Sequence, residues 1–309
     1  MRTKEDFVTN VTTIVKEMLG AGYQVDTQSI RKNNDTEHLA LQIRKVNACA
    51  APLIYIDQYY EAYRLNEADL YTIVQRIVDT YEHCMMSPTA LSLEDWKGNL
   101  SKEFILEHVF FKVVNGEMNE ASFSSVPHRN VVGDLAMVFC VMFDSSEDGV
   151  ASVTLTNLLC ELKGITEQEL FDNAMQNTPL LFPMETVSFA SFKTSMMNGT
   201  DESEADNLGI PALDKDFFIL TNSRKVNGAS TMLYPGVLKD IANHLGTDFY
   251  IIPSSIHELL ILKDNNNLED AESLTGVIKE VNDTQLTNEE ILSYKLYHYN
   301  RQLDTISVA

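Results

Sequence analysis

Apolar residues recur at helical spacing in the first twenty positions of the chain, and beyond them they alternate with polar residues. The apolar positions of the first segment are Phe7, Val11, Ile14, Val15 and Met18. A period of three to four residues is typical of an amphipathic helix that packs on a core. The alternation at residues 23–30 and 38–46 predicts two strands around a polar turn, and a third short strand is expected at residues 52–56.

The clearest helical pattern lies at residues 70–81, where one face is apolar throughout. We expect Asn66 to cap this helix, with Asp69 in its first turn. Residues 85–99 then contain a proline and no apolar period, which predicts a boundary between two units.

The middle of the chain predicts both helices and strands. Residues 102–114 read as a helix, and the nearly continuous apolar run at 133–143 predicts a strand that is covered on both faces. Residues 150–155 are expected to pair with that strand. Two short helices follow: the first is stopped by Gly164, and the second begins at a capping box formed by Thr166 and Glu169. Residues 192–213 are polar and acidic, and they predict an exposed loop.

Residues 213–301 carry the most consistent pattern. A strand at 216–222 is followed by a helix at 234–246, with Pro235 in its first turn and Gly246 past its end. The apolar runs around Pro253 predict a pair of strands at 249–264. The last elements are a helix at 267–282 and a segment at 287–301, which begins at a second capping box and ends as a strand.

This order of elements predicts an α+β protein with mixed or antiparallel sheets and packed helices, divided into two units. The expected domains are an N-terminal α+β unit at residues 1–86 and a C-terminal α+β domain at residues 100–309.

The charge of the chain narrows the classes of function. Its 309 residues include 45 acidic and 23 basic side chains, a formal net charge of −22. Such a surface repels phosphate backbones and anionic lipids, so we expect no direct binding to nucleic acid or to membranes. A basic protein is the partner that this charge favours.

The compartment follows from the apolar runs and the cysteines. No run approaches the length of a membrane span, and the N-terminus lacks the apolar segment of a signal peptide. The four cysteines form no CxxC pair: Cys49, Cys84, Cys140 and Cys160. We therefore expect a cytoplasmic protein with reduced thiols.

A scan for catalytic and cofactor motifs is negative. The chain has no GxGxxG, no GxxxxGK[ST] and no GxSxG, and its seven histidines show no metal-ligand spacing with each other or with cysteine. We expect neither a cofactor nor a metal.

Ser254, His257 and Glu258 are three residue types that hydrolases combine, and they lie close together in the sequence. If they continued the following strand, His257 and Glu258 would project to opposite faces and could not act as a base and its orienting carboxylate. A turn that joins two strands is therefore the favoured interpretation of this stretch.

Three further places in the sequence are candidates for function. His128 is expected in a loop before the buried strand at 133–143, a place where ligand sites often form, and a surface loop is the simpler interpretation. Asn227 and Gly228 predict a tight turn in which Gly228 supplies the positive φ. A tyrosine series could line a pocket but is more typical of a half-buried core: Tyr234, Tyr294, Tyr297 and Tyr299.

Several stretches of the sequence, most of them in its C-terminal part, have a more specific choice of residues than the predicted helices and strands need. They are VPHRNVVGDLAMVFCVMF, NTPLLFP, KVNGASTMLYPGVLKDIANHLGTDFYIIPSSIHELLILKD and LSYKLYHYNR. These stretches resemble an uncharacterised, domain-of-unknown-function family of cytosolic proteins from anaerobic Gram-positive gut bacteria. The resemblance covers most of the chain and is strongest at residues 227–301. It implies one natural fold over the whole chain, and it assigns no activity, cofactor or catalytic residue.

These observations favour a non-catalytic binding or interaction protein with an acidic surface. The first alternative is a hydrolase with a site near His128, Asn227 and His257. The second is an acidic mimic of nucleic acid that inhibits a basic nucleic-acid-binding protein.

Overall fold

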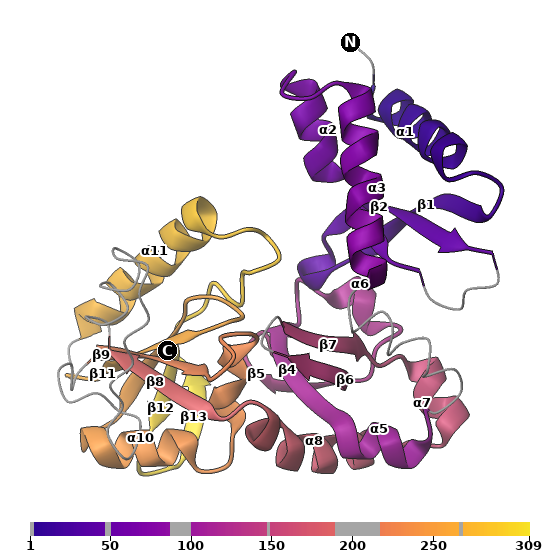
Figure 1. Cartoon of the computed structure of the whole chain (residues 1–309). Coiled ribbons are helices and arrows are strands. Elements are labelled where there is room, and N and C mark those ends of the chain that lie inside the picture. Colours follow the sequence, from indigo (N-terminus) through magenta and orange to yellow (C-terminus); the bar gives the residue numbers. More distant parts are fainter. Residues whose placement is uncertain (1–2, 47–50, 87–99, 147–148, 189–216, 266–267) are drawn as a thin grey trace. The chain divides into compact units, whose positions relative to one another are not determined.

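A computed structural model of the chain describes residues 3–46, 51–86, 100–146, 149–188, 217–265 and 268–309. The chain divides into two compact units: residues 1–32 with 36–100, and residues 33–35 with 101–309. The described strands form three sheets, and every pairing among them is antiparallel (Figure 1). The predicted α+β class is confirmed. The two predicted domains stay a prediction, and the expected boundary at residues 87–99 lies outside the described residues.

The first unit packs helices on a three-stranded sheet of order β1-β2-β3. Its elements are α1 (Lys4–Leu19), β1 (Tyr23–Arg31), β2 (Glu37–Lys45), β3 (Leu53–Tyr55), α2 (Asp57–Arg64) and α3 (Leu70–Met86). The buried positions of its core include Phe7, Val11, Val15, Leu41, Ile43, Ile73, Val74 and Ile77. The apolar face predicted for the first helix is confirmed except at Met18, which is 40% exposed.

Helix α3 begins at Leu70 and is capped by Asp69, so the prediction of Asn66 as its cap is wrong. Oδ1 of Asp69 accepts a hydrogen bond from the N–H of Thr72, at 2.8 Å. Asn66 instead adopts a left-handed backbone with φ of 57°. A cap must offer its side-chain oxygen to the second or third N–H of the helix, and Asp69 stands at that distance along the chain whereas Asn66 does not.

The second unit contains the other two sheets. Its strands are β4 (Val109–Asn115), β5 (His128–Val132), β6 (Leu135–Ser146), β7 (Gly149–Thr154), β8 (Met184–Ser188), β9 (Phe217–Asn222), β10 (Phe249–Pro253), β11 (Leu259–Lys263), β12 (Tyr297–Asn300) and β13 (Thr305–Val308). Its helices are η1 (Asn33–Asp35), α5 (Lys102–His108), α6 (Glu120–Phe123), α7 (Asn157–Lys163), α8 (Glu167–Leu181), η2 (Gly228–Leu233), α10 (Val237–Leu245) and α11 (Leu268–Gln285).

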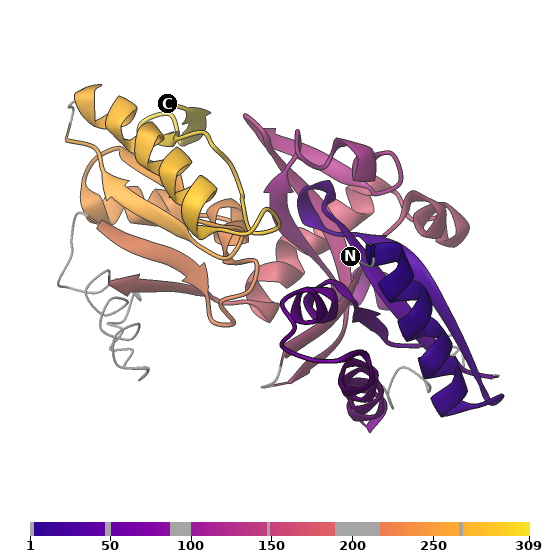
Figure 2. The same ribbon diagram turned by 90° about the horizontal axis from the view of Figure 1, so that it is seen from above.

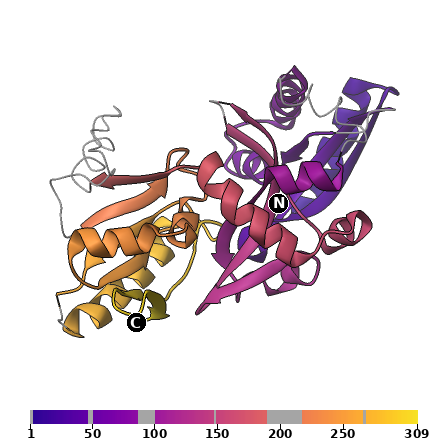
Figure 3. The same ribbon diagram turned by 90° about the horizontal axis from the view of Figure 1, so that it is seen from below.

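The four-stranded sheet is built around β6. This strand pairs with β4 along one edge and with β5 and then β7 along the other. Its residues 135–142 are all buried, as predicted for a strand covered on both faces. Helix α8 packs on β4 and α5 packs on α8 (Figure 3). The predicted Thr166–Glu169 capping box at the start of α8 is confirmed, as is the left-handed Gly164 after α7.

The predicted helix at residues 102–114 is wrong in its second half. Ser101 caps α5, which ends at His108, and β4 begins at Val109. Six of the seven residues of β4 are buried, and Phe111 lies opposite Phe139 of β6. An apolar run of this length fits a buried helix or a buried strand equally well, and pairing with β6 decides for the strand.

The six-stranded sheet has the order β13-β12-β10-β11-β9-β8. Helix α11 lies on one of its faces, where Ile278 packs with Tyr250 and Ile252 (Figure 2). Helix α10 lies at the opposite face (Figures 1 and 3). The predicted strand pair at 249–264 is confirmed, with Ile251 opposite Ile261. The loop predicted at residues 192–213 lies outside the described residues.

Two local predictions in this part need correction. Helix α10 begins at Val237, so Pro235 precedes the helix, in a turn closed by the N–H of Val237 and the carbonyl of Tyr234. Gly246 follows the helix with φ of 76°, as predicted. The second capping box, at Thr287, closes a turn and no helix: the Thr287 hydroxyl donates to Oε2 of Glu290 at 2.7 Å, and the segment continues irregularly to β12.

Candidate functional site

Three of the predicted site residues lie in the connection between β10 and β11. Ser254 directly follows β10, and His257 and Glu258 directly precede β11. The connection is therefore a loop at both histidine and glutamate, and the predicted turn between two strands is confirmed. Asn227 comes from a different segment, at the start of η2.

Hydrogen bonds join the β10–β11 connection to β9 and to the segment that follows β9. The N–H of Asn227 donates to Nδ1 of His257 at 3.2 Å. The hydroxyl of Thr221 donates to the carbonyl of His257 at 2.8 Å, and the N–H of Ala229 donates to the carbonyl of Ile256 at 3.2 Å. Because Nδ1 of His257 accepts a hydrogen bond in this arrangement, a neutral imidazole carries its proton on Nε2.

Gly228 allows this close approach, and the reason differs from the predicted one. The positive φ lies at Asn227, at 52°, whereas Gly228 has no positive φ. A Cβ on Gly228 would stand 2.2 Å from the His257 carbonyl oxygen and 2.2 Å from Oγ1 of Thr221. Glycine is therefore required because two backbone segments touch here, and asparagine tolerates the left-handed conformation beside it.

The serine hydroxyls of the connection form hydrogen bonds with groups other than the imidazole ring of His257. The Ser254 hydroxyl donates to Oε1 of Glu258 at 3.2 Å, and the Ser255 hydroxyl accepts from the backbone N–H of His257 at 3.0 Å. Among the described residues no hydrogen bond joins a serine hydroxyl to the His257 ring. A nucleophile with its own base requires that contact.

Glu258 supplies the carboxyl of this group, and its pKa is shifted. Burial raises its pKa, and the hydrogen bond from Ser254 and the charges of His257 and Lys225 oppose that rise. Burial disfavours the charged form of a carboxyl group. The Glu258 carboxyl therefore holds its proton to a higher pH than a freely exposed glutamate does.

His128 lies apart from this group in its contacts. It is the first residue of β5, so the prediction of a loop at this position is wrong. Its ring stacks on Phe123 at 4.0 Å between centroids, and its Nδ1 lies 3.0 Å from the carbonyl oxygen of Val126. None of these described contacts involves Asn227 or His257.

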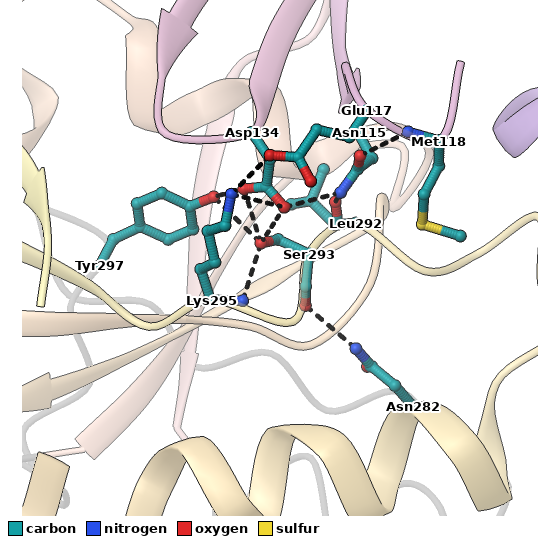
Figure 4. Close-up of polar contacts among 9 residues, drawn as sticks. All are labelled: Asn115, Glu117, Met118, Asp134, Asn282, Leu292, Ser293, Lys295 and Tyr297. Atoms are coloured by element: carbon teal, nitrogen blue, oxygen red, sulfur yellow. Dashed lines mark hydrogen bonds and ion pairs between the residues drawn. The ribbon is translucent and has the colours of Figure 1, made fainter. Parts of the chain in front are cut away.

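A buried carboxylate, Asp134, forms a polar cluster that no sequence motif indicates (Figure 4). Its side chain is 4% exposed and lies in the turn between β5 and β6. It accepts hydrogen bonds from Nδ2 of Asn115 at 2.9 Å, from the hydroxyl of Ser293 at 2.9 Å and from the hydroxyl of Tyr297. Nζ of Lys295 stands 3.9 Å from the same carboxylate.

The partners of Asp134 are engaged in further hydrogen bonds. Asn115 also donates to the carbonyl of Leu292 at 3.0 Å and accepts from the N–H of Met118 at 2.9 Å. The hydroxyl of Ser293 accepts a hydrogen bond from the N–H of Lys295. The backbone carbonyl of Ser293 accepts one from Nδ2 of Asn282 in α11. The cluster thus joins the end of β4, the β5–β6 turn, α11 and the start of β12, and its polar groups are directed to one another.

The energetic role of this cluster follows from its burial. An isolated buried carboxylate is strongly unfavourable, and paired donors offset that cost. Burial and the hydrogen bond to Asp134 both raise the pKa of Tyr297, so its hydroxyl stays protonated and donating. The cluster is a structural joint between the two sheets of the second unit.

Thiols and acidic or imidazole groups do not gather into a metal site in the part of the chain that is described. No group of three or more His, Cys, Asp or Glu residues in metal-binding proximity occurs there. Cys84, Cys140 and Cys160 form no disulfide with each other, and Cys49 lies outside the described residues. Of the helices described, none is both long and apolar enough to cross a membrane.

The fold and these sites define an α+β protein of antiparallel sheets in which the buried polar cluster around Asp134 joins two sheets. The model of one family, described as a family of unknown function (DUF5688), matches residues 4–301. The chain belongs to this family. No curated protein and no solved structure matches the chain.

Proposed function

We propose that the protein is a non-catalytic binding protein that acts in the cytoplasm and recognises a basic protein partner through its exposed carboxylates. The inference that the protein is not catalytic rests on one observation: the candidate catalytic side chains are hydrogen-bonded to partners other than those that catalysis requires. The Asn227 N–H donates to His257, and Ser254 donates to Glu258. These bonds hold a loop together, and a hydrolase would need the serine on the imidazole.

The partner's charge is inferred from the surface of α11. This helix buries Ile278 against the sheet and exposes Glu272, Glu280 and Asp283. Residues 201–309 also carry the largest acidic excess of the chain, 18 acidic against 8 basic residues. A surface of one sign speeds the encounter with a partner of the opposite sign and disfavours wrong partners.

Not every carboxylate of this region belongs to such a surface. Asp264 is 13% exposed in its side chain and lies 3.1 Å from Nε2 of His298. Asp283 accepts a hydrogen bond from the Tyr294 hydroxyl at 3.0 Å. Glu272 and Glu280 are therefore the charges on α11 to reverse in an experiment.

The experiment is a capture of partners by the full chain at about 0.05 M salt, followed by association kinetics with each captured protein. Raising salt to roughly 0.5 M shortens the Debye length from about 14 Å to about 4 Å. We expect association to slow by about tenfold or more, because charge complementarity acts mainly on the association rate. The double variant Glu272→Lys and Glu280→Lys should slow association at low salt by a similar factor.

The matched control is Glu17→Lys with Glu82→Lys, which makes the same change of net charge at exposed helical positions of the first unit. It should slow association less than the α11 variant. Association that responds to neither salt nor the α11 variant would contradict the proposal and leave the charge a role in solubility.

The hydrolase alternative retains one supporting observation, the proximity of Asn227, Ser254, His257 and Glu258. Labelling of the purified chain by a serine-reactive fluorophosphonate, lost in Ser254→Ala and His257→Ala, would favour it. The nucleic-acid-mimic alternative predicts that a captured partner is released by competing DNA or RNA. Retention of the partner against excess nucleic acid would contradict that alternative.

A further inference from the structure

A pocket of about 400 Å³ opens on the second unit and belongs to none of the sites described above. It lies between the end of β5, the start of α10 and the hairpin of β12 and β13, which are distant in sequence. Volumes of this order are typical of sites for small organic ligands.

Apolar side chains form one part of the pocket walls, and polar groups form the other part. They include Val131, Val132, Leu233, Leu238 and Ile306. Tyr234 also contributes to the lining, but it is buried and its hydroxyl points away, donating to the carbonyl of Phe182 at 2.9 Å. An apolar body of a ligand can therefore be taken out of water here without facing an unpaired tyrosine hydroxyl.

Three polar side chains converge at the pocket: Lys239, Tyr299 and Asp304. The Tyr299 hydroxyl donates to Oδ1 of Asp304 at 2.5 Å, and Nζ of Lys239 lies 3.2 Å from Oδ2. Tyr299 is buried, whereas the side chains of Lys239 and Asp304 are 59% and 50% exposed. The tyrosine thus fixes the carboxylate from inside, and the lysine reaches it from the solvent side.

Carboxylates in and near the pocket act on Tyr299. Burial and the hydrogen bond to Asp304 raise the pKa of Tyr299, and the charges of Asp240 and Asp248 act in the same direction. Lys239 is the cation of the lining, and the guanidinium of Arg301 is directed to the carbonyl of Gly246 at 2.9 Å. Three carboxylates therefore act on Tyr299, and one of them, Asp304, lies in the pocket lining.

We propose that this pocket binds a primary organic ammonium ion with an apolar body, whose ammonium group replaces Nζ of Lys239 on Asp304. The apolar body would lie against Val131, Leu233 and Ile306. The Tyr299 hydroxyl continues to donate to Oδ1, so the carboxylate keeps its orientation while Oδ2 and the tyrosine oxygen accept from the ligand. This ligand site is independent of the partner surface on α11.

Exposure of the Lys239–Asp304 pair makes this exchange favourable. Ion pairs that are half exposed are weak, so an incoming ammonium loses little by displacing Lys239. Burial of the ligand's apolar body then adds a favourable contribution that Lys239, whose side chain is 59% exposed, does not make.

The first experiment titrates the full chain with three probes of equal length: hexylamine, hexanol and hexanoate. Methyl NMR spectra locate binding through the shifts of Val131, Leu233 and Ile306. We expect hexylamine to bind about fivefold or more tightly than hexanol, as one exposed charge pair allows. Hexanoate should bind most weakly. Equal binding of the amine and the alcohol, or tighter binding of hexanoate, would overturn the proposal.

Two variants separate the roles of the charges. Asp304→Asn should remove the preference for hexylamine over hexanol, and asparagine suits the left-handed backbone at this position, where φ is 54°. Lys239→Met removes the competing cation and keeps an apolar stem, so it should tighten hexylamine binding by up to about fivefold. Weaker hexylamine binding in Lys239→Met would contradict the inference, and a loss of hexanoate binding in the same variant would identify an anion site.

Glu161→Gln is the matched control, because it removes one exposed negative charge from α7, outside the pocket lining. Its hexylamine affinity should match that of the parent chain.

Two sources can supply the ammonium group, a free amine or a lysine side chain of a protein. Titration with a short peptide that contains one lysine distinguishes these sources, and the same peptide with norleucine in place of lysine is its control. Lysine-dependent shifts of the Val131, Leu233 and Ile306 methyl groups identify a protein source. Shifts with hexylamine but with neither peptide identify a free amine.

Discussion

The hydroxyl of Tyr297 donates a hydrogen bond to the carboxylate of Asp134, a residue 163 positions away in the chain. Both side chains are buried, and Ser293 and Asn115 complete the set of donors around the carboxylate. A charge in such a position stabilises the fold only while all its donors remain in place.

Removal of a donor or of the carboxylate should therefore be costly. We expect Tyr297→Phe to lower the free energy of unfolding by about 2 kcal/mol, and Asp134→Ala by about 3 kcal/mol or more, because buried partners are left unpaired. Urea denaturation of the full chain measures both values. Tyr294→Phe is the control: its hydroxyl also donates to a carboxylate, Asp283, but that pair is exposed. If Tyr294→Phe lowered the free energy of unfolding as much as Tyr297→Phe does, the Asp134 cluster would not be the structural joint between the two sheets.

Gly228 should tolerate no side chain. Its Cβ would stand 2.2 Å from the carbonyl oxygen of His257, so Gly228→Ala must separate the β10–β11 connection from the segment after β9. We expect a loss of about 3 kcal/mol in the free energy of unfolding, within the range of strained and overpacked substitutions.

Gly276 provides the matched comparison for Gly228. It lies in α11, has no positive φ, and leaves open space where a Cβ would stand, with nothing within 4 Å. Gly276→Ala should raise stability by roughly 0.5–1 kcal/mol, because alanine favours the helix over glycine. A neutral Gly228→Ala would show that the close approach does not exist in solution.

The buried carboxyl of Glu258 should make stability depend on pH. Its pKa is raised in the folded chain by burial, so the protonated form is favoured by folding. The stabilisation from this group is fully present below the unfolded pKa of glutamate and is lost as pH rises through the higher folded value.

Glu258→Gln keeps an oxygen that accepts from Ser254 and carries no charge. We expect it to match the parent chain at acidic pH and to exceed the parent's stability above the folded pKa, as measured by urea denaturation across a pH series. The exposed Glu280→Gln should show no such rise. A Glu258→Gln chain that is less stable than the parent at neutral pH would mean that the charged form is the favoured one.

Hydrogen exchange should be slowest in the centre of the six-stranded sheet. Strand β10 pairs with β11 on one side and with β12 on the other, and residues 249–253 are all buried. Strand β13 pairs only with β12 in the described part of the chain, and it is mostly exposed. We expect the N–H of Ile251 to exchange at least about a thousandfold more slowly than that of Ser307, since edge strands open at a lower free energy. Similar rates at the two positions would contradict the strand order.

The sequence by itself determined the elements whose signals are local. The apolar period predicts α3, the capping box predicts the start of α8, and Gly246 predicts the end of α10. Each of these signals acts between residues a few positions apart, so it needs no knowledge of the rest of the fold. The alternation at 23–30 and 38–46 likewise predicts β1 and β2.

Only the tertiary structure decided which polar residues meet. Residues 109–114 form a strand because β6 pairs with them, and the same apolar run alone fits a helix. Asp134 contacts Tyr297, and Lys239 contacts Asp304, because segments that are far apart in the chain pack together. Sequence spacing carries no information about such contacts, because they depend on how whole sheets and helices fit together. For the same reason, the requirement for glycine at position 228 becomes visible only when His257 is placed against it.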